Sequence, residues 1–99
     1  METVDFEFRG KKYKMRQLSW DEDLSLQEQC TDPLTGTLRY KQFSLLRVAR
    51  SLVEPKILID DLKQLPAQEG NFLAAMAAQL NDLSPSELKK NQTPTTNST

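Results

Sequence analysis

The sequence predicts an α+β fold, mostly α, in which an N-terminal β-hairpin is followed by three to five helices and a disordered C-terminal tail. Two observations predict it. Residues 3–9 and 12–18 alternate between apolar and charged side chains, as in paired strands with one face on a core. From residue 19 onward the apolar residues recur at helical spacing, and Pro and Gly interrupt the pattern. The chain has 99 residues, so we expect one small domain over residues 1–90.

The hairpin is expected over residues 3–18, with Gly10 and Lys11 as its two-residue loop. Gly in the first loop position suits a type II′ turn, whose twist matches that of paired strands. The basic side chains of the hairpin then largely face its own carboxylates, so the hairpin is a poor nucleic-acid patch. The cross-strand pairs in this register are Phe8 with Tyr13, Phe6 with Met15, Glu7 with Lys14, and Asp5 with Arg16.

Capping and breaking residues set the helix boundaries. Ser19 and Glu22 have the spacing of a capping box, which starts a helix over residues 19–30. Asp-Pro and Gly in the segment 31–36 end that helix. The second helix, over 38–53, carries the main apolar face and ends because Pro55 disfavours helical geometry in the residue before it.

Three further helices are expected. Asp60 is a plausible cap for a short helix over 60–65, and Pro66 suits the first turn of a helix over 66–83. Ser84 and Pro85 predict a last helix over 85–90. Residues 91–99 contain no apolar side chain, so we expect them to be a disordered tail.

The composition disfavours catalysis and metal binding. Histidine is absent, which removes the commonest general base and metal ligand, and the one cysteine leaves no zinc pattern. Asp21/Asp23 and Asp60/Asp61 are pairs at helix starts, where negative charge is favourable without any catalytic role. We therefore expect no enzyme, no catalytic residue, no cofactor and no metal, and we interpret Cys30 as a small buried apolar residue.

The second helix carries an unexpected stripe opposite its apolar face: Tyr40, Phe43, Arg47 and Arg50. One interpretation is that its first turn packs on the hairpin or the preceding loop. The other is that these four residues form a surface that binds a partner or a second subunit, since aromatic residues beside Arg are typical interface anchors. Geometry favours a half-buried Phe43 and an exposed Tyr40 beside Arg47, because Phe43 lies nearer to the apolar face.

Charge and hydropathy narrow the choice of partners. Thirteen basic residues against fourteen acidic ones give a net charge of −1, which argues against a general polyanion binder and leaves little protection against weak self-association. The chain shows no signal peptide and no long apolar run, so we expect a cytosolic protein that does not bind membranes.

The layout resembles that of the tail assembly chaperones of tailed bacteriophages. The residues that carry the resemblance are the hairpin Val4–Arg16, the helix entry Leu18–Trp20, the segment Ser51–Pro55, and Leu80–Ser84. The resemblance spans residues 3–84. It implies a non-enzymatic protein that acts in the cytoplasm of the infected bacterial host and binds the tape measure protein, or another tail protein, during virion morphogenesis. Members of that family are often made also as a longer form through a translational frameshift near the C-terminus.

Two alternatives to the chaperone remain. The chain is instead a structural virion component, such as a baseplate or connector protein, if it stays in the mature particle. The second alternative is a small nucleic-acid-binding regulator that uses Arg39, Arg47 and Arg50 beside the two aromatic residues, although the chain has no excess of positive charge.

Overall fold

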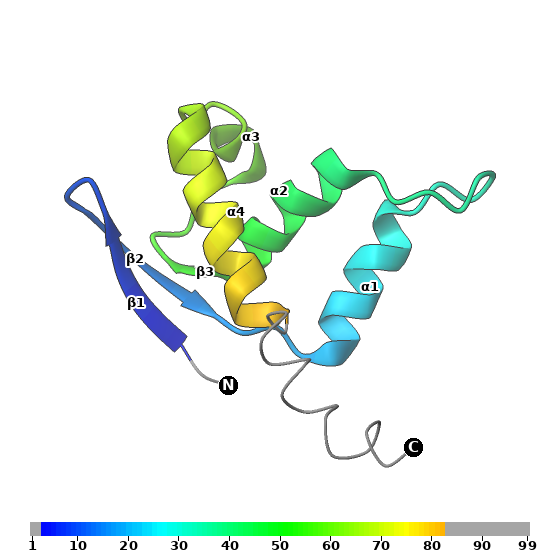
Figure 1. Cartoon of the computed structure of the whole chain (residues 1–99), viewed down its shortest axis with the longest axis horizontal. Helices are drawn as coiled ribbons and strands as arrows, with labels where there is room; N and C mark the ends of the chain where they lie inside the picture. The colour runs from blue at the N-terminus through cyan, green and yellow to red at the C-terminus, as the bar shows by residue number, and fades with distance from the viewer. Residues whose placement is uncertain (1–2, 83–99) are drawn as a thin grey trace, which may run out of the picture.

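The computed structural model describes residues 3–82 and confirms the α+β fold with an N-terminal antiparallel hairpin (Figure 1). The predicted helix 85–90 and the predicted tail 91–99 lie outside the described residues. Within residues 3–82, three strands form one sheet in the order β1-β2-β3, and the same range contains four helices. The elements are β1 (Thr3–Phe8), β2 (Lys11–Arg16), α1 (Trp20–Cys30), α2 (Tyr40–Ser51), β3 (Leu52–Glu54), α3 (Ile59–Leu62) and α4 (Ala67–Asn81).

The hairpin loop is Arg9-Gly10, so the predicted loop Gly10-Lys11 is wrong. Arg9 and Gly10 have φ values of 51° and 84°, the pair of positive values that a type I′ turn requires. The cross-strand pairs are shifted by two residues from the predicted register, which leaves every side chain on its predicted face. The observed pairs are Thr3 with Arg16, Val4 with Met15, Asp5 with Lys14, Phe6 with Tyr13, Glu7 with Lys12 and Phe8 with Lys11.

Tertiary contacts favour the observed register over the predicted one. The rings of Phe6 and Tyr13 stack with centroids 5.6 Å apart, and Phe72 of α4 packs on Phe6 and Phe8 at 5.5 and 4.6 Å. The same register places Lys11 on the apolar face, where it reaches α4. Arg9 adopts a positive φ, which costs a non-glycine residue about 1–2 kcal/mol, and the contacts of this register offset that cost.

The strand β3 replaces the end of the predicted second helix. The helix was expected to reach residue 53, but α2 ends at Ser51 and Leu52–Glu54 pair antiparallel with β2. Leu and Val fit a helix and a buried strand equally well by pattern. The open edge of β2 decides between them, because its backbone N–H and C=O groups need partners.

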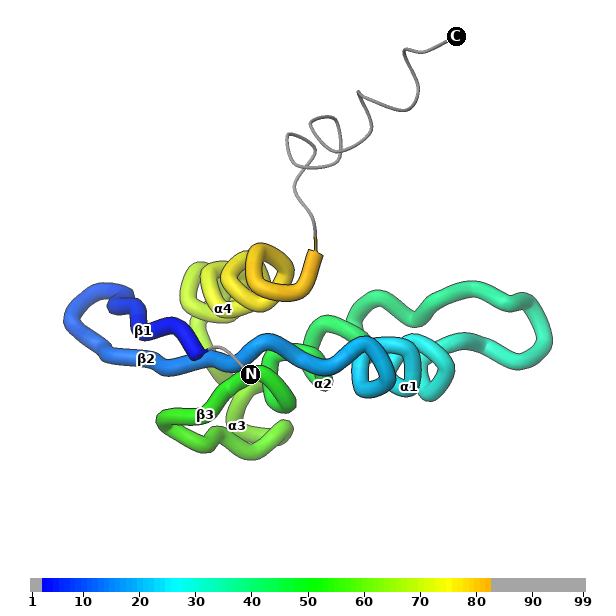
Figure 2. Tube along the Cα trace, turned by 90° about the horizontal axis from the view of Figure 1, so that it is seen from below, coloured from blue at the N-terminus to red at the C-terminus, as the bar shows by residue number. Residues whose placement is uncertain are grey.

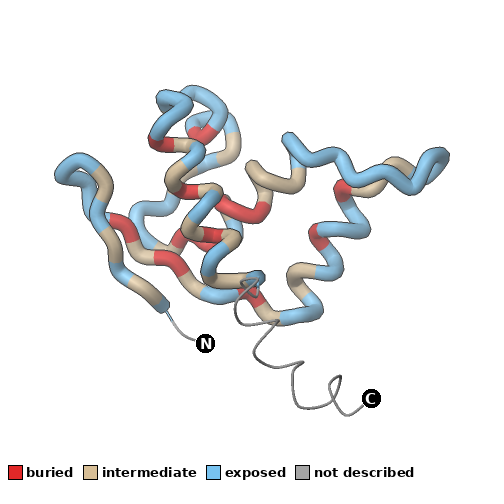
Figure 3. The backbone as a smooth tube through the Cα atoms, in the orientation of Figure 1, coloured by how far each residue is buried: buried red, intermediate tan, exposed pale blue. Residues whose placement is uncertain are grey.

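The main core lies between the sheet, α2 and α4. Red segments of these elements face one another in Figure 3, and Figure 2 shows α4 on one side of β2 and α2, with β3 and α3 on the other. Burial of each large apolar side chain contributes about 1.5–3 kcal/mol. The buried cluster consists of Tyr13, Met15, Val48, Leu52, Leu62, Leu73 and Ala77.

Helix α1 starts and packs as its sequence predicts. Ser19 accepts a hydrogen bond from the Glu22 backbone N–H, and the Glu22 carboxylate accepts one from the Ser19 N–H, which completes the capping box. Leu26 and Cys30 are buried where α1 packs against α2, so the interpretation of Cys30 as a buried apolar residue is confirmed.

Helices α3 and α4 differ from the predicted bounds in detail. α3 covers Ile59–Leu62 rather than 60–65, and its N-cap is Leu58, so Asp60 is not a cap but lies in the first turn. α4 runs over Ala67–Asn81 with Pro66 at its N-cap, and the predicted end at residue 83 lies outside the described part of the chain. Acidic residues are favourable within a first turn as well as at a cap, so the sequence alone does not separate the two positions.

The substitution Gly10→Ala should destabilise the protein by about 1–2 kcal/mol, because an alanine would occupy the left-handed conformation that Gly10 adopts. Gly70→Ala, within α4, is the matched control. A Cβ there meets nothing within 4 Å, so we expect a gain of about 0.5–1 kcal/mol. Chemical denaturation of the two variants measures both effects, and equal stability of Gly10→Ala and the original protein would contradict the type I′ turn.

Candidate protein-binding groove

The four residues of the predicted partner-binding stripe do not form one surface. Tyr40 is 74% exposed and Arg50 is also exposed, whereas Phe43 is half-buried and Arg47 is only 8% exposed. The predicted contrast between Tyr40 and Phe43 is therefore confirmed. Arg47 belongs to the interior, so it offers little surface for the predicted contact with a partner.

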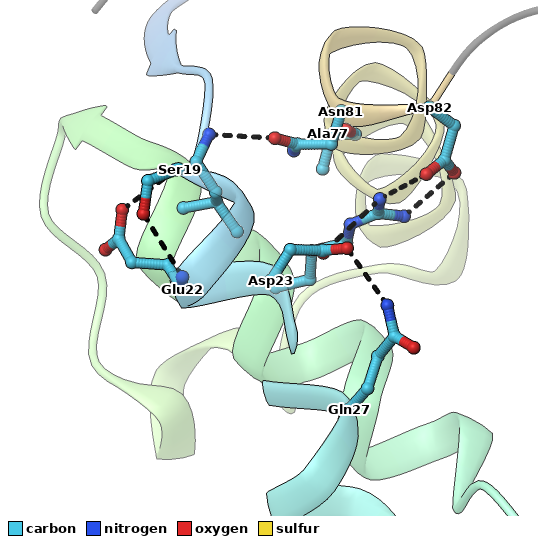
Figure 4. Close-up of polar contacts among 9 residues, drawn as sticks. Ser19, Glu22, Asp23, Gln27, Ala77, Asn81 and Asp82 are labelled. Atoms are coloured by element: carbon cyan, nitrogen blue, oxygen red, sulfur yellow. Dashed lines mark hydrogen bonds and ion pairs between the residues drawn. The ribbon is translucent and has the colours of Figure 1, made fainter. Parts of the chain in front are cut away.

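Arg47 is an internal anchor between three helices. Its guanidinium donates to both oxygens of Asp82, at 3.1 and 2.6 Å, and lies 3.7 Å from Asp23 of α1. It also lies over the Phe43 ring, 5.2 Å from the centroid. Figure 4 shows Asp23 and Asp82 approaching this position from α1 and from the end of α4. The helical period of α2 places Arg47 on a polar face, but only the packing of α1 and α4 brings carboxylates to that face.

Asn81 makes a second polar contact at the same end of α4. Its side-chain oxygen accepts from the Leu18 backbone N–H at 2.8 Å, and its amide donates to the Ala77 carbonyl at 2.8 Å (Figure 4). The segment between β2 and α1 is therefore attached to α4. Sequence reasoning assigned Asn81 no structural role, and no local pattern identifies it.

A groove of about 460 Å³ lies between α2 and the segment formed by α3 and α4. Tyr40, Ser44 and Val48 line it from α2 at a spacing of four residues, which places them on one side of that helix. Gly70 and Ala74 line it from α4, and their small size leaves the space open. Its other apolar lining residues are Leu45, Leu62, Leu65 and Leu73.

A second hollow of about 440 Å³ continues this groove toward α1. The two hollows share Lys41, Leu45 and Lys63, and we call them together the α2 trough. Arg39 adds a third cation, and among residues 3–82 no Asp or Glu lines either hollow. The α2 trough is therefore an apolar depression with basic side chains along it, a chemistry suited to binding another protein.

Glu69 forms a separate buried cluster beneath the hairpin. Its carboxylate accepts a hydrogen bond from the Tyr13 hydroxyl and lies 3.2 Å from the ammonium of Lys11. The Tyr13 hydrogen bond holds the pKa of Glu69 below its usual value, while burial and the neighbouring carboxylate raise the pKa of Tyr13 to about 12. Neither hollow of the α2 trough is lined by these residues, so the cluster attaches the hairpin to α4 and takes no part in the groove.

Within residues 3–82, no three His, Cys, Asp or Glu side chains come together in a way that holds a metal ion. No helix in that range is long and apolar enough to cross a membrane. Comparison of the chain with protein-family models, curated proteins and solved structures gives no match. The geometry of the α2 trough therefore carries the functional argument.

Tyr40→Ser and Phe43→Ser should differ sharply in their effect on stability. We expect Tyr40→Ser to change the free energy of unfolding by less than about 0.5 kcal/mol, since its ring is mostly exposed. Phe43→Ser should cost about 1.5–3 kcal/mol, because the ring is half-buried and supports the Arg47 guanidinium. Thermal and urea unfolding measure both values, and equal large losses would show that Tyr40 is part of the core.

Stability should depend on the ionisation of Glu69. Because its folded-state pKa is lowered from 4.5, the stabilisation is fully present above that value and is lost as the pH falls through the folded-state pKa. We expect Glu69→Gln to be less stable by about 1–2 kcal/mol at neutral pH and to approach the original protein in acid.

Unfolding temperatures from about pH 2 to pH 7 measure this difference. Glu28→Gln is the matched control, because it removes an exposed carboxylate of α1 that has no cation within 4.0 Å among residues 3–82. A Glu69→Gln profile parallel to that of the original protein would contradict the assigned role of the carboxylate.

Proposed function

We propose that this chain is a phage tail assembly chaperone, an interaction protein without enzymatic activity, that binds the tape measure protein in the cytoplasm of the infected bacterial host and keeps it soluble. The α2 trough is the observation that carries the proposal. The similarity of the hairpin and of the helix-boundary segments to this family supports it.

The trough suits a helical client. Tape measure proteins are long and helical, and an amphipathic helix binds a groove through side chains spaced three or four residues apart. The apolar floor of the trough offers sites for such side chains, and exposed Tyr40 at its edge is a suitable anchor. A trough of this kind binds a segment of a client without requiring a large or rigid chaperone.

The nucleic-acid alternative loses support from the placement of the arginines. Arg47 is buried against Asp82 and Asp23, and Arg39 lies 3.8 Å from Asp32, so Arg50 is the one member of the proposed basic set without a carboxylate within 4.0 Å in residues 3–82.

The alternative of a structural virion component uses the same trough for a different partner. Mass spectrometry of purified virions separates the two, because a chaperone leaves the particle before maturation.

Co-expression with the tape measure protein encoded by the same genome tests the proposal. The original chain should keep that protein soluble and copurify with it. Gly70→Phe should abolish copurification, because the new ring occupies the open space of the trough that faces residue 70.

Gly70→Ala is the matched control, because it changes the same position and leaves the space open, so copurification should persist. Circular dichroism checks that both variants remain folded. Absence of copurification with the original chain would contradict the proposed function, and copurification with folded Gly70→Phe would contradict the role of the trough.

A further inference from the structure

We propose that the α2 trough of one copy binds the exposed face of α1 from a second copy, so that the free protein self-associates head to tail. The inference goes beyond client binding, because it depends on two surfaces of this chain and on no other protein.

The exposed face of α1 is the first of these surfaces. Trp20 is 79% exposed and Leu24 is 46% exposed, and their spacing of four residues places them on the same side of the helix. Leu26 and Cys30 are buried on the side that packs against α2. Tryptophan is the residue most enriched among the anchors of protein interfaces, and Trp20 is the only tryptophan of the chain. Trp20 and Leu24 are exposed to water in the monomer, so their burial against another copy would lower the free energy of the pair of molecules.

Opposite charges on the two surfaces favour this occupant. α1 contains four carboxylates and no Lys or Arg. Glu22 is paired with Arg16, and Asp23 with Arg47, whereas Asp21 and Glu28 have no cation within 4.0 Å among residues 3–82. Asp21 directly follows Trp20, and Glu28 lies one turn beyond Leu24, so both carboxylates lie beside the apolar pair on the helix surface. Carboxylates beside an apolar pair match a trough that combines apolar and basic side chains.

The basic side chains of the trough are available for such a contact. Lys41 has no carboxylate within 4.0 Å in the described part of the chain. Exposed Lys63 lies 4.0 Å from exposed Asp60, and exposed Arg39 lies 3.8 Å from half-buried Asp32. Exposed ion pairs of this length contribute little to the stability of the fold, so the cations are free to pair with carboxylates of another copy. The net charge of the chain is only −1, so this complementarity arises from the local placement of charge.

The dimensions of the two surfaces also agree. Trp20, Leu24 and Glu28 are spaced over eight residues of α1, or about 12 Å along the helix axis. The positions that line the trough from α2 extend from Tyr40 to Val48, which is the same length. A hollow of about 460 Å³ has room for an indole ring beside Tyr40.

The contact has to form between two copies. Within one copy, neither Trp20 nor Leu24 is among the residues that line the trough. The two surfaces differ, so the contact between them is heterologous. In a dimer, one copy keeps an open trough and the other keeps an open α1 face, and further copies can add at these surfaces unless a ring closes.

Complementation between two variants tests the proposal. Trp20→Ser removes the α1 anchor and keeps the trough, whereas Gly70→Phe fills the trough and keeps the anchor. In sedimentation velocity the original protein should show concentration-dependent association. Each variant alone should be monomeric at the concentrations at which the original protein associates, because its dissociation constant for self-association is raised by about tenfold or more. An equimolar mixture of the two variants should form a heterodimer, because one functional trough and one functional α1 face remain.

Tryptophan fluorescence and charge reversal provide the second measurement. Emission from Trp20 should shift to shorter wavelength as the concentration of the original protein rises, and it should not shift in Gly70→Phe. Lys41→Glu should weaken the association, and Asp21→Lys in the other copy should restore it. Lys12→Ser, an exposed position of the hairpin outside both surfaces, is the control and should associate as the original protein does.

Monomeric original protein at every concentration up to about 1 mM would overturn the proposal. So would unchanged association of Trp20→Ser, which would place the interface elsewhere, or a mixture of variants that stays monomeric. Client binding is a separate outcome, since Trp20→Ser keeps an intact trough and should still copurify with the tape measure protein. Failure of self-association is thereby distinguished from failure of the proposed function.

Discussion

The attachment of α4 at both of its ends holds the fold together. Near its start, Glu69 binds the hairpin through Tyr13 and Lys11, and at its end Asn81 and Asp82 bind the segment before α1 and the guanidinium of Arg47. Between these ends, Leu73 and Ala77 are buried in the main core. Apolar burial supplies most of the stabilisation, but it is not directional. The polar contacts fix how α4 lies across the sheet and α2.

The position of α4 in turn creates the α2 trough. One side of the trough consists of Gly70, Asn71, Leu73 and Ala74, and its opposite side belongs to α2. Displacement of α4 by a few ångströms would close the space or expose the core. The structural contacts of Arg47 and Glu69 therefore help to set the shape of the trough, although neither residue lines the two hollows.

The net charge of the chain is close to zero, but its acidic and basic side chains are concentrated on different surfaces. The four carboxylates of α1 lie within eight residues of one another, and three cations line the α2 trough: Arg39, Lys41 and Lys63. Summed over the chain these charges nearly cancel, so net charge alone suggests no preferred partner. The unpaired carboxylates of α1 and the cations of the trough therefore create local potentials of opposite sign, on which steering and orientation would depend in a contact with another protein.

The sequence by itself determined the α+β class, the faces of the hairpin, the capping box at Ser19 and Glu22, and the burial of Cys30 and exposure of Tyr40. Each depends on residues a few positions apart, whose spacing acts through local geometry. The tertiary structure alone decided the hairpin register, the strand β3 and the interior role of Arg47. These depend on contacts between segments distant in the chain: Phe72 with the hairpin, the open edge of β2 with Leu52–Glu54, and Asp82 with α2. A periodic pattern shows which side of an element is apolar, but it does not specify which partner covers a polar side chain on the opposite face.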